Sequence, residues 1–396
     1  MPWKQWQTGD PITINRIVWD GLESEYMQDV LERDWFGPGK YAQILQGQLS
    51  NFTGIPHAQL TNSGTSALLI AATILQNMGY WKKGDLILHP GCTFPAPSNV
   101  IVQAGMVPVY VDVEEGTYNI DAKLVAQAIE KYPEIKGAII PHLLGNSPDM
   151  DALLEALNGR PLIEDCCDTL GSLWGDQHVG NLGDLAAFSF YGSHHVTTAG
   201  VGGALLTKFP EMLQMATSLT FWGREYVKTD DLYSEFKQRY TYDTIGYDMQ
   251  MSEIQAAFGV GQMHRLEEGN EGRAGQFADT HEFMREWEDW LVLPRSHSKA
   301  DPSWFGYPIC VKKEAPFSRE PLARHLLNNS IEIRPMFAGN ITRQPAYAKV
   351  PYVIASDLPQ ADRNLSSGLF LPAWGGMTGQ MTGRLFEVIE EFMGRW

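Results

Sequence analysis

The feature that most constrains the fold is a regular alternation of short apolar runs with helical stretches between residues 58 and 207. Several runs lack polar residues at alternate positions, which is typical of strands buried on both faces of a mainly parallel sheet. The intervening stretches, such as 66–78 and 151–157, predict crossover helices. We therefore expect an α/β domain of three layers with a mainly parallel seven-stranded sheet. Its strands are expected at 58–61, 86–89, 107–113, 138–143, 162–165, 186–190 and 204–207.

After about residue 263 this alternation ends and the pattern becomes mixed. The expected elements are a charged helical segment, an extended run and two further helices, at 266–290, 304–311, 319–328 and 380–393. Such a mixture predicts a smaller α+β domain. We expect a large domain at residues 1–265, which includes an N-terminal segment, and a small C-terminal domain at residues 266–396.

The charge balance and the cysteines limit the classes of partner and the compartment. Acidic residues outnumber basic ones by 47 to 30, so nucleic acid and anionic membranes, which both need a basic face, are not expected as main partners. We find neither a signal pattern at residues 1–16 nor an apolar run near the length of a membrane span. The cysteines show no metal-ligand spacing and would make an awkward disulfide framework. These observations predict a cytoplasmic protein.

A first candidate site is the run Asn62-Ser63-Gly64-Thr65-Ser66-Ala67, which follows an expected strand and opens an expected helix. Gly64 lets backbone amides approach a phosphate, and the helix start adds a favourable partial charge. The hydroxyls of Thr65 and Ser66 can donate further hydrogen bonds. An ordinary helix cap in a tight turn explains the same residues.

A second candidate is the acidic run from Glu164 to Asp168, at the carboxyl end of an expected strand. Such positions face the ligand crevice of open parallel sheets. An ionised Asp165 there can keep a pyridine nitrogen protonated, which makes a cofactor an electron sink. A helix N-cap is the alternative interpretation of this aspartate.

A third candidate begins at Ser189, at the end of the next strand, and continues to His194 and His195 before a glycine-rich turn. A histidine at this place is a general base, a metal ligand or a hydrogen-bonded structural residue. Metal binding is disfavoured because no second group of ligands at helical spacing accompanies the pair. We therefore expect no metal.

Together, and in this order, the three segments resemble the DegT/StrS sugar aminotransferase family, which is built on the fold-type I pyridoxal phosphate scaffold. By this resemblance, Gly64, Thr65 and Ser189 hold the cofactor phosphate, Phe94 stacks on the pyridine ring and Asp165 pairs with the ring nitrogen, with Asp168 also in the cofactor site. The resemblance also implies a homodimer with shared active sites. It extends to Trp35-Phe36-Gly37-Pro38-Gly39, Pro90-Gly91-Cys92-Thr93-Phe94, Val111-Asp112-Val113, Thr117-Tyr118-Asn119 and Ile245-Gly246-Tyr247.

The chain departs from the aminotransferases at His194, where they carry the lysine that bonds covalently to the cofactor. The same replacement marks a dehydrase branch of the family, typified by CDP-4-keto-6-deoxyglucose 3-dehydrase and the colitose-pathway dehydratase. By this likeness Arg224, Asn340 and Arg343 are candidate substrate-binding residues. The likeness to the CDP-sugar enzyme is carried by Leu144-Gly145-Asn146, Cys166-Cys167-Asp168, Pro302-Ser303-Trp304-Phe305-Gly306 and Phe337-Ala338-Gly339-Asn340-Ile341-Thr342-Arg343-Gln344-Pro345.

The branch implies dehydration at carbon 3 of a nucleotide-linked 4-keto-6-deoxyhexose, in deoxysugar biosynthesis, with pyridoxamine phosphate held non-covalently. His194 is then the base for the cofactor's methylene proton, because its ordinary pKa lies near the operating pH. Asp165 stabilises the charge that develops on the ring. For His195 a structural hydrogen bond is the expected role.

Two more departures from the relatives concern an iron–sulfur cluster and a contact between subunits. The CDP-sugar enzyme carries a [2Fe–2S] cluster on cysteines after its Trp-Gly-Arg segment, here Trp222-Gly223-Arg224, but no cysteine follows before Tyr247. We expect no iron–sulfur cluster, since such clusters need thiolates. We expect glutamate to be the amino donor, as in the colitose pathway. Asp248 stands where relatives usually have an asparagine that reaches the neighbouring subunit's cofactor phosphate, and a carboxylate there would repel a phosphate.

Two other functions stay open at this point. One is a cofactor-binding protein with reduced catalysis that acts as a regulator or assembly partner. The other is a nucleotide-sugar aminotransferase-like protein that manages without the lysine.

Overall fold

The seven apolar runs all form strands of one sheet in the computed structural model, which describes residues 6–7, 9–225 and 231–396. The strands are β1 (His57–Thr61), β2 (Leu86–Pro90), β3 (Val107–Val111), β4 (Ile135–Pro141), β5 (Leu162–Asp165), β8 (Leu185–Ser189) and β9 (Gly203–Thr207). Their order is β1-β9-β8-β5-β4-β2-β3, followed at the edge by an eighth strand, β14 (Val353–Ile354). Only β9 runs antiparallel to its neighbours. The expected α/β class is confirmed, with one strand more than the sequence predicted.

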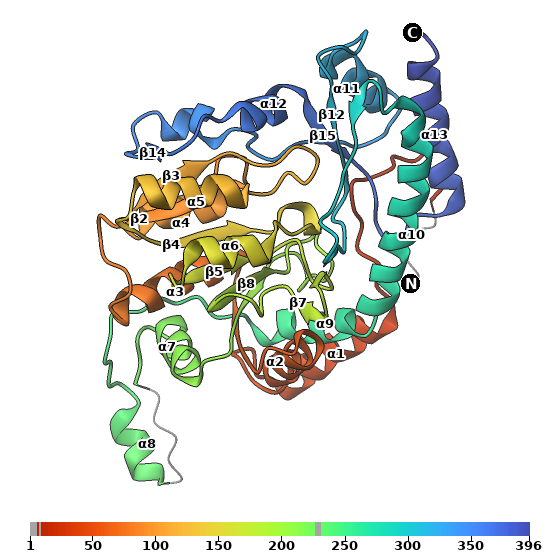
Figure 1. Ribbon diagram of the computed structural model, residues 1–396. Helices are drawn as coiled ribbons and strands as arrows, with labels where there is room; N and C mark the ends of the chain where they lie inside the picture. Colours follow the sequence, from red (N-terminus) through yellow and green to blue (C-terminus); the bar gives the residue numbers. More distant parts are fainter. Residues whose placement is uncertain (1–5, 8, 226–230) are drawn as a thin grey trace.

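Helices cover both faces of this sheet (Figure 1). Ile139 and Ile163 point to one face and Ala138 and Leu162 to the other, so successive residues of β4 and β5 enter different cores. This double burial explains why the runs lack polar alternation. The first face is covered by α3 (Gly64–Asn77), α4 (Pro95–Gln103) and α7 (Pro210–Thr220). The second is covered by α1 (Gly21–Arg33), α2 (Lys40–Thr53), α5 (Ala122–Lys131), α6 (Met150–Leu157) and α9 (Glu253–Met263).

The C-terminal part builds a second core around a four-stranded antiparallel sheet. The strands are β10 (Leu291–Val292), β12 (Tyr307–Val311), β15 (Gly368–Leu371) and β13 (Arg334–Pro335). The helices are α10 (Leu266–Met284), α11 (Arg319–Asn328), α12 (Pro359–Ser367) and α13 (Gly379–Met393). Trp6 and Ile12 from the N-terminal end join this core. The helix expected at 266–290 ends at Met284 and continues as a short 3-10 turn.

Contacts between the two parts are extensive. β14 adds to the edge of the large sheet, and β11 (Ala300–Asp301) pairs with β6 (Leu173–Trp174), which also pairs with β7 (Gln177–His178). A further apolar cluster joins Leu143 and Leu144 to Trp304 and Phe305. The division at residues 265 and 266 stays a prediction.

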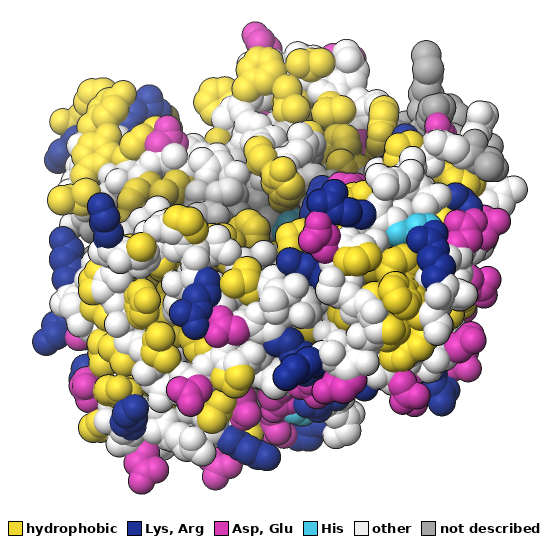
Figure 2. All heavy atoms as spheres, turned by 90° about the horizontal axis from the view of Figure 1, so that it is seen from above, with side chains coloured by type: hydrophobic (Ala, Val, Ile, Leu, Met, Phe, Trp, Pro, Cys, Tyr) yellow, Lys and Arg dark blue, Asp and Glu magenta, His cyan; other side chains and the backbone are white. Residues whose placement is uncertain are grey.

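Charges of both signs are mixed on the face of the molecule seen in Figure 2. On the face seen in Figure 2, Lys and Arg side chains are interspersed with Asp and Glu rather than gathered into one basic patch. The short helix α8 (Leu232–Gln238) projects from the body (Figure 1). Within the described ranges, no helix has the length and apolar character needed to cross a membrane.

The helix α10 is held close to the loop before α13 by a contact between two glycines. A Cβ placed on Gly272 would lie 2.6 Å from the carbonyl oxygen of Gly375, a separation that real Cβ atoms do not show. One turn later, a Cβ on Gly275 would meet nothing within 4 Å. A methyl group at residue 272 would therefore clash with Gly375, whereas one at residue 275 of the same helix would meet no atom.

We predict opposite effects for two alanine substitutions in α10. Gly275→Ala should stabilise the protein by about 0.5–1 kcal/mol, because alanine loses less backbone entropy in a helix. Gly272→Ala should destabilise it by about 1–3 kcal/mol, because the methyl group overlaps Gly375. Urea unfolding of both variants beside the parent chain measures the difference. Equal stabilities for the two variants would contradict the close contact.

Candidate active site

The start of α3 lies against the ends of β5 and β8. Ser63 caps the helix by accepting a hydrogen bond from the Ser66 amide at 3.1 Å, and Ser66 Oγ donates to Asn62 at 2.6 Å. A Cβ on Gly64 would lie 2.8 Å from Cys167 Sγ and 2.9 Å from Ser189 Cβ, so only glycine fits. The first turn of α3 therefore brings its free amides to the place where Ser189 ends β8. This is the geometry of an anion site at a helix N-terminus.

Asp165 ends β5 as a buried carboxylate at the same edge of the sheet. It accepts a hydrogen bond from the Cys167 amide at 3.2 Å, and no lysine or arginine of the described ranges forms an ion pair with it. Burial raises the pKa of Asp165 above its ordinary value. Burial and the neighbouring charge of Asp165 raise the pKa of Asp168 to about 7. This edge of the sheet therefore holds two largely buried acidic groups, and a cationic ligand beside them would favour their ionised forms.

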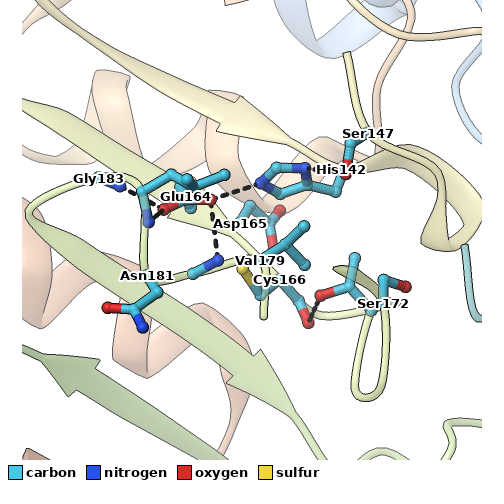
Figure 3. Close-up of polar contacts among 12 residues, drawn as sticks. His142, Ser147, Glu164, Asp165, Cys166, Ser172, Val179, Asn181 and Gly183 are labelled. Atoms are coloured by element: carbon cyan, nitrogen blue, oxygen red, sulfur yellow. Dashed lines mark hydrogen bonds and ion pairs between the residues drawn. The ribbon is translucent and has the colours of Figure 1, made fainter. Parts of the chain in front are cut away.

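The preceding residue, Glu164, points away from Asp165 into a buried hydrogen-bond network (Figure 3). Its Oε2 lies 2.8 Å from His142 Nε2 and accepts from the Gly180 amide at 2.8 Å, while Oε1 accepts from the Leu182 amide at 2.9 Å. Although burial opposes ionisation, these hydrogen bonds hold the pKa of Glu164 below its ordinary value. The Glu164 carboxylate thus holds the loop that directly precedes β8, because it accepts hydrogen bonds from the Gly180 and Leu182 amides.

His142, Glu164 and Cys166 also form a group of possible metal ligands, the one such group found among the described residues, with ligand atoms within 4.8 Å of one another. The Glu164 oxygens already accept hydrogen bonds from three partners named above, and His142 Nδ1 lies 3.1 Å from Ser147 Oγ. A metal would have to displace these bonds. We assign no metal to this group.

His194 lies beside Asp168. Its Nε2 is 3.7 Å from Asp168 Oδ1, and its Nδ1 is buried without a hydrogen-bond partner among the described residues. Asn15 holds the loop in place by donating to the carbonyl of Ser193 and, at 3.4 Å, to that of His194. Burial lowers the pKa of His194 to about 3, and the positive charge of Arg273 acts in the same direction. The imidazole is therefore neutral at pH 7 and able to accept a proton.

His195 is turned the other way. Its Nε2 lies 2.9 Å from the carbonyl oxygen of Ser303, and burial lowers its pKa well below the ordinary value. A neutral imidazole that donates to a backbone carbonyl matches the structural role expected for this residue.

Phe94 directly precedes α4, and 53% of its surface is exposed. Its ring centroid lies 5.9 Å from that of Phe337, and the Ala338 amide donates to the Thr93 carbonyl at 3.1 Å. The segment that begins at Phe337 therefore packs against Thr93 and Phe94. An exposed aromatic ring at this position offers a face to a planar ligand.

The candidate substrate residues each contact other residues of the chain, and their role at a substrate stays a prediction. Asn340 donates to Asp362 Oδ1 at 2.8 Å, and Arg343 forms a bidentate pair with both oxygens of Asp362 at 3.0 Å. Arg224 lies on another segment, with its guanidinium 5.5 Å from the Trp222 ring. Asp248 forms a bridge to Phe221 and accepts from Gln250 at 3.1 Å. Residues 226–230, within the segment without cysteines, lie outside the described residues.

Gly64, Ser189, Asp165, Asp168 and His194 thus meet at the carboxyl ends of β5 and β8, with Thr65 exposed at the start of α3. Sequence reasoning missed Arg273, Asn15 and the His142–Glu164 pair. Arg273, Asn15 and His142 come from distant segments, and the residue type alone carries no signal; Glu164 lies in the acidic run, but its partner could not be predicted.

Comparisons with known proteins place the chain in a family. Residues 19–390 match the model of the DegT/DnrJ/EryC1/StrS aminotransferase family. The chain is 33% identical over 393 residues to the lipopolysaccharide biosynthesis protein RfbH of Salmonella typhimurium, covering 94% of this chain and 89% of that protein. It is 31% identical over 378 residues to dTDP-4-dehydro-2,6-dideoxy-D-glucose 3-dehydratase of Saccharopolyspora spinosa, covering 90% and 81%.

Among solved structures, the chain resembles that of the E. coli GDP-4-keto-6-deoxy-D-mannose-3-dehydratase with bound hydrated PLP. The TM-score is 0.88 at 25% identity, and the match covers 96% of this chain and all of that one. The fold and the family match define the pyridoxal phosphate-dependent aminotransferase class. Within it, the chain belongs to the DegT/DnrJ/EryC1/StrS aminotransferase family.

Proposed function

We propose that the chain uses pyridoxal or pyridoxamine phosphate to remove the 3-hydroxyl of a nucleotide-linked 4-keto-6-deoxyhexose, with glutamate as amino donor. The observation that carries the proposal is His194, a neutral histidine beside Asp168 at the position where the family's aminotransferases have a lysine. Relatives named as 3-dehydratases act on dTDP- and GDP-linked keto-sugars and support the substrate class. A cytoplasmic homodimer with shared active sites belongs to the same proposal.

The pocket residues fit such a cofactor. The first turn of α3 with Gly64, Thr65 and Ser189 would hold its phosphate, and Phe94 would cover one face of its ring. Asp165, buried and without a cationic partner within the described ranges, would pair with a protonated ring nitrogen. When bound, the cofactor supplies an electron sink for the charge that develops during elimination.

His194 is the proposed base. Its Nδ1 has no hydrogen-bond partner in the described part of the chain and is the nitrogen we expect to take the proton, while Nε2 faces Asp168 at 3.7 Å. The Asp168 carboxylate then stabilises the imidazolium by charge attraction. We assign His195 no part in the chemistry, because its Nε2 is held by the Ser303 carbonyl; its Nδ1, like that of His194, has no hydrogen-bond partner among the described residues.

An aminotransferase-like activity is the second candidate, since relatives named GDP-perosamine synthase match at 27% identity. A cofactor-binding protein with reduced catalysis is disfavoured because the phosphate, ring and Asp165 positions are intact. Whether the sugar product contains nitrogen distinguishes the aminotransferase from the dehydratase.

The first prediction concerns the cofactor linkage. Without a lysine at position 194, borohydride treatment of the loaded protein should leave no cofactor covalently attached, as measured by intact mass. His194→Lys should create a reducible linkage and abolish dehydration. His195→Lys is the matched control and should create none, because that position faces Ser303. A stable adduct on the parent chain would refute the proposed place of His194.

The second prediction concerns Asp165. Asp165→Asn keeps the shape but removes the charge that holds the ring nitrogen protonated. Loss of a charge-assisted hydrogen bond costs about 1.5–3 kcal/mol, which would slow turnover by roughly ten- to a hundredfold or more. Steady-state rates with saturating cofactor measure the loss. If the variant turns over at the parent rate, Asp165 does not have this role and Asp168 becomes the candidate.

The third prediction concerns how the reaction ends. Because the segment after Trp222 lacks thiolates, we expect turnover with glutamate alone, without a reductase. Ammonia and a 2-oxo acid should form in equal amounts, measured by coupled enzymatic assays. Anaerobically purified protein should show no absorbance between about 500 and 600 nm. If turnover strictly requires an added reductase and forms no ammonia, glutamate is not the donor. The proposed dehydration would not be contradicted by that result.

A further inference from the structure

Residues 12–18 form a strap that is tied to the C-terminal core. The Glu332 amide donates to the Ile12 carbonyl at 2.8 Å, and Glu332 Oε2 accepts from the Ile14 amide at 3.0 Å. The indole nitrogen of Trp374 donates at 3.0 Å to the carbonyl of the residue between the two isoleucines. Ile12 itself is buried in the C-terminal core. The strap therefore takes its position from the C-terminal part of the chain.

Asn15, in the middle of the strap, contacts the loop that carries His194. Its Nδ2 donates to the Ser193 carbonyl and, at 3.4 Å, to the His194 carbonyl, while its Oδ1 accepts from the amide of the next residue at 2.8 Å. Beyond Asn15 the strap is tied to α9, where Gln262 donates to the Val18 carbonyl at 2.9 Å. Because other bonds hold the strap on both sides of Asn15, the particular effect of the Asn15 amide is on the loop.

The His194 ring depends on its backbone for its position. Its Nδ1 has no hydrogen-bond partner in the described part of the chain, and its Nε2 is 3.7 Å from Asp168 Oδ1, too far for a hydrogen bond. The ring also lies against Phe305, with the two ring centroids 5.2 Å apart. Within the described ranges, only Asn15 donates hydrogen bonds to the Ser193 and His194 carbonyls. A shift of this backbone would therefore move the ring.

We propose that Asn15 is a positioning residue for the proposed proton transfer: its side-chain amide fixes the backbone of Ser193 and His194 and so aims the imidazole. The strap makes the C-terminal core the reference for this position. A general base has to lie within hydrogen-bond reach of the proton that it removes, and a misplacement of about 1 Å can cost about a hundredfold in rate. The inference rests on the proposed function, in which His194 is the base, but its geometric part is tested without turnover.

The geometric test is NMR of the full chain with labelled histidine, without substrate, with the His194 ring signal assigned by its loss in His194→Asn. Because this ring lies against Phe305, a change in its position alters the ring current that it experiences and moves the signal. Asn15→Leu should move the signal. So should Asn15→Asp, which keeps the acceptor for the next amide but cannot donate to carbonyls. Asn15→Ser, whose hydroxyl is too short to reach the loop, takes their place if neither folds.

The matched control is Gln76→Leu. It removes a side-chain amide that donates at 2.9 Å to the backbone carbonyl of Ala104, in another part of the large domain. This variant loses a hydrogen bond of the same kind as Asn15→Leu does. It should leave both the His194 signal and kcat unchanged.

Turnover gives the second readout. In Asn15→Leu and Asn15→Asp, kcat should fall about ten- to a hundredfold while KM for the sugar changes little, because the base is displaced and the substrate contacts remain. Asn15→Gln, which restores the donor on a longer side chain, should recover part of the loss.

Two results would overturn the proposal. One is an unmoved His194 signal in the folded Asn15 variants, whatever their rate. The other is a moved signal with the parent kcat, since the position of the ring would then not matter to the reaction. A moved signal in a protein that dehydrates no sugar would support the placement of His194 by Asn15 and count against the proposed function alone.

Discussion

The pocket depends on the close approach of the first turn of α3 to the ends of β5 and β8. A side chain on Gly64 would collide with Cys167 and Ser189, so this turn fits only because residue 64 is glycine. The contact aligns the free amides of α3 with Ser189 and brings them to the edge that carries Asp165. One steric constraint therefore joins segments that are about a hundred residues apart, and every group assigned a chemical role is placed relative to it.

The charges in the pocket follow from burial. Asp165 and Asp168 lie where ionisation is costly, and this makes the pocket receptive to a cationic ring. The same burial keeps His194 neutral, so that it is a base rather than an acid at pH 7. Glu164, the neighbour of Asp165, stays ionised because His142 and backbone amides form hydrogen bonds to its oxygens, and these bonds hold it away from Asp165 (Figure 3).

Much of the large sheet could be predicted because local patterns of apolar residues indicate its strands. The runs that became β4 and β5 are apolar on both faces, and that property is visible without a structure. The edge strand β14 was missed because two residues of a distant loop carry no pattern of their own. The role of Asn340 and Arg343 at the substrate stays a prediction; the structure adds that both bind Asp362, a partner about twenty residues away that no spacing rule reveals. Arg273 was missed for the same reason, since the burial of one arginine in a charged helix is a tertiary fact.

The central claim is that a histidine at position 194 makes this member of the family a dehydratase. The most direct measurement is the mass of the sugar product after incubation with pyridoxal phosphate, glutamate and a panel of nucleotide-linked 4-keto-6-deoxyhexoses. The account predicts a product that has lost one oxygen atom and contains no nitrogen in its sugar. A product that keeps the 3-hydroxyl and gains an amino group at carbon 4 would contradict it.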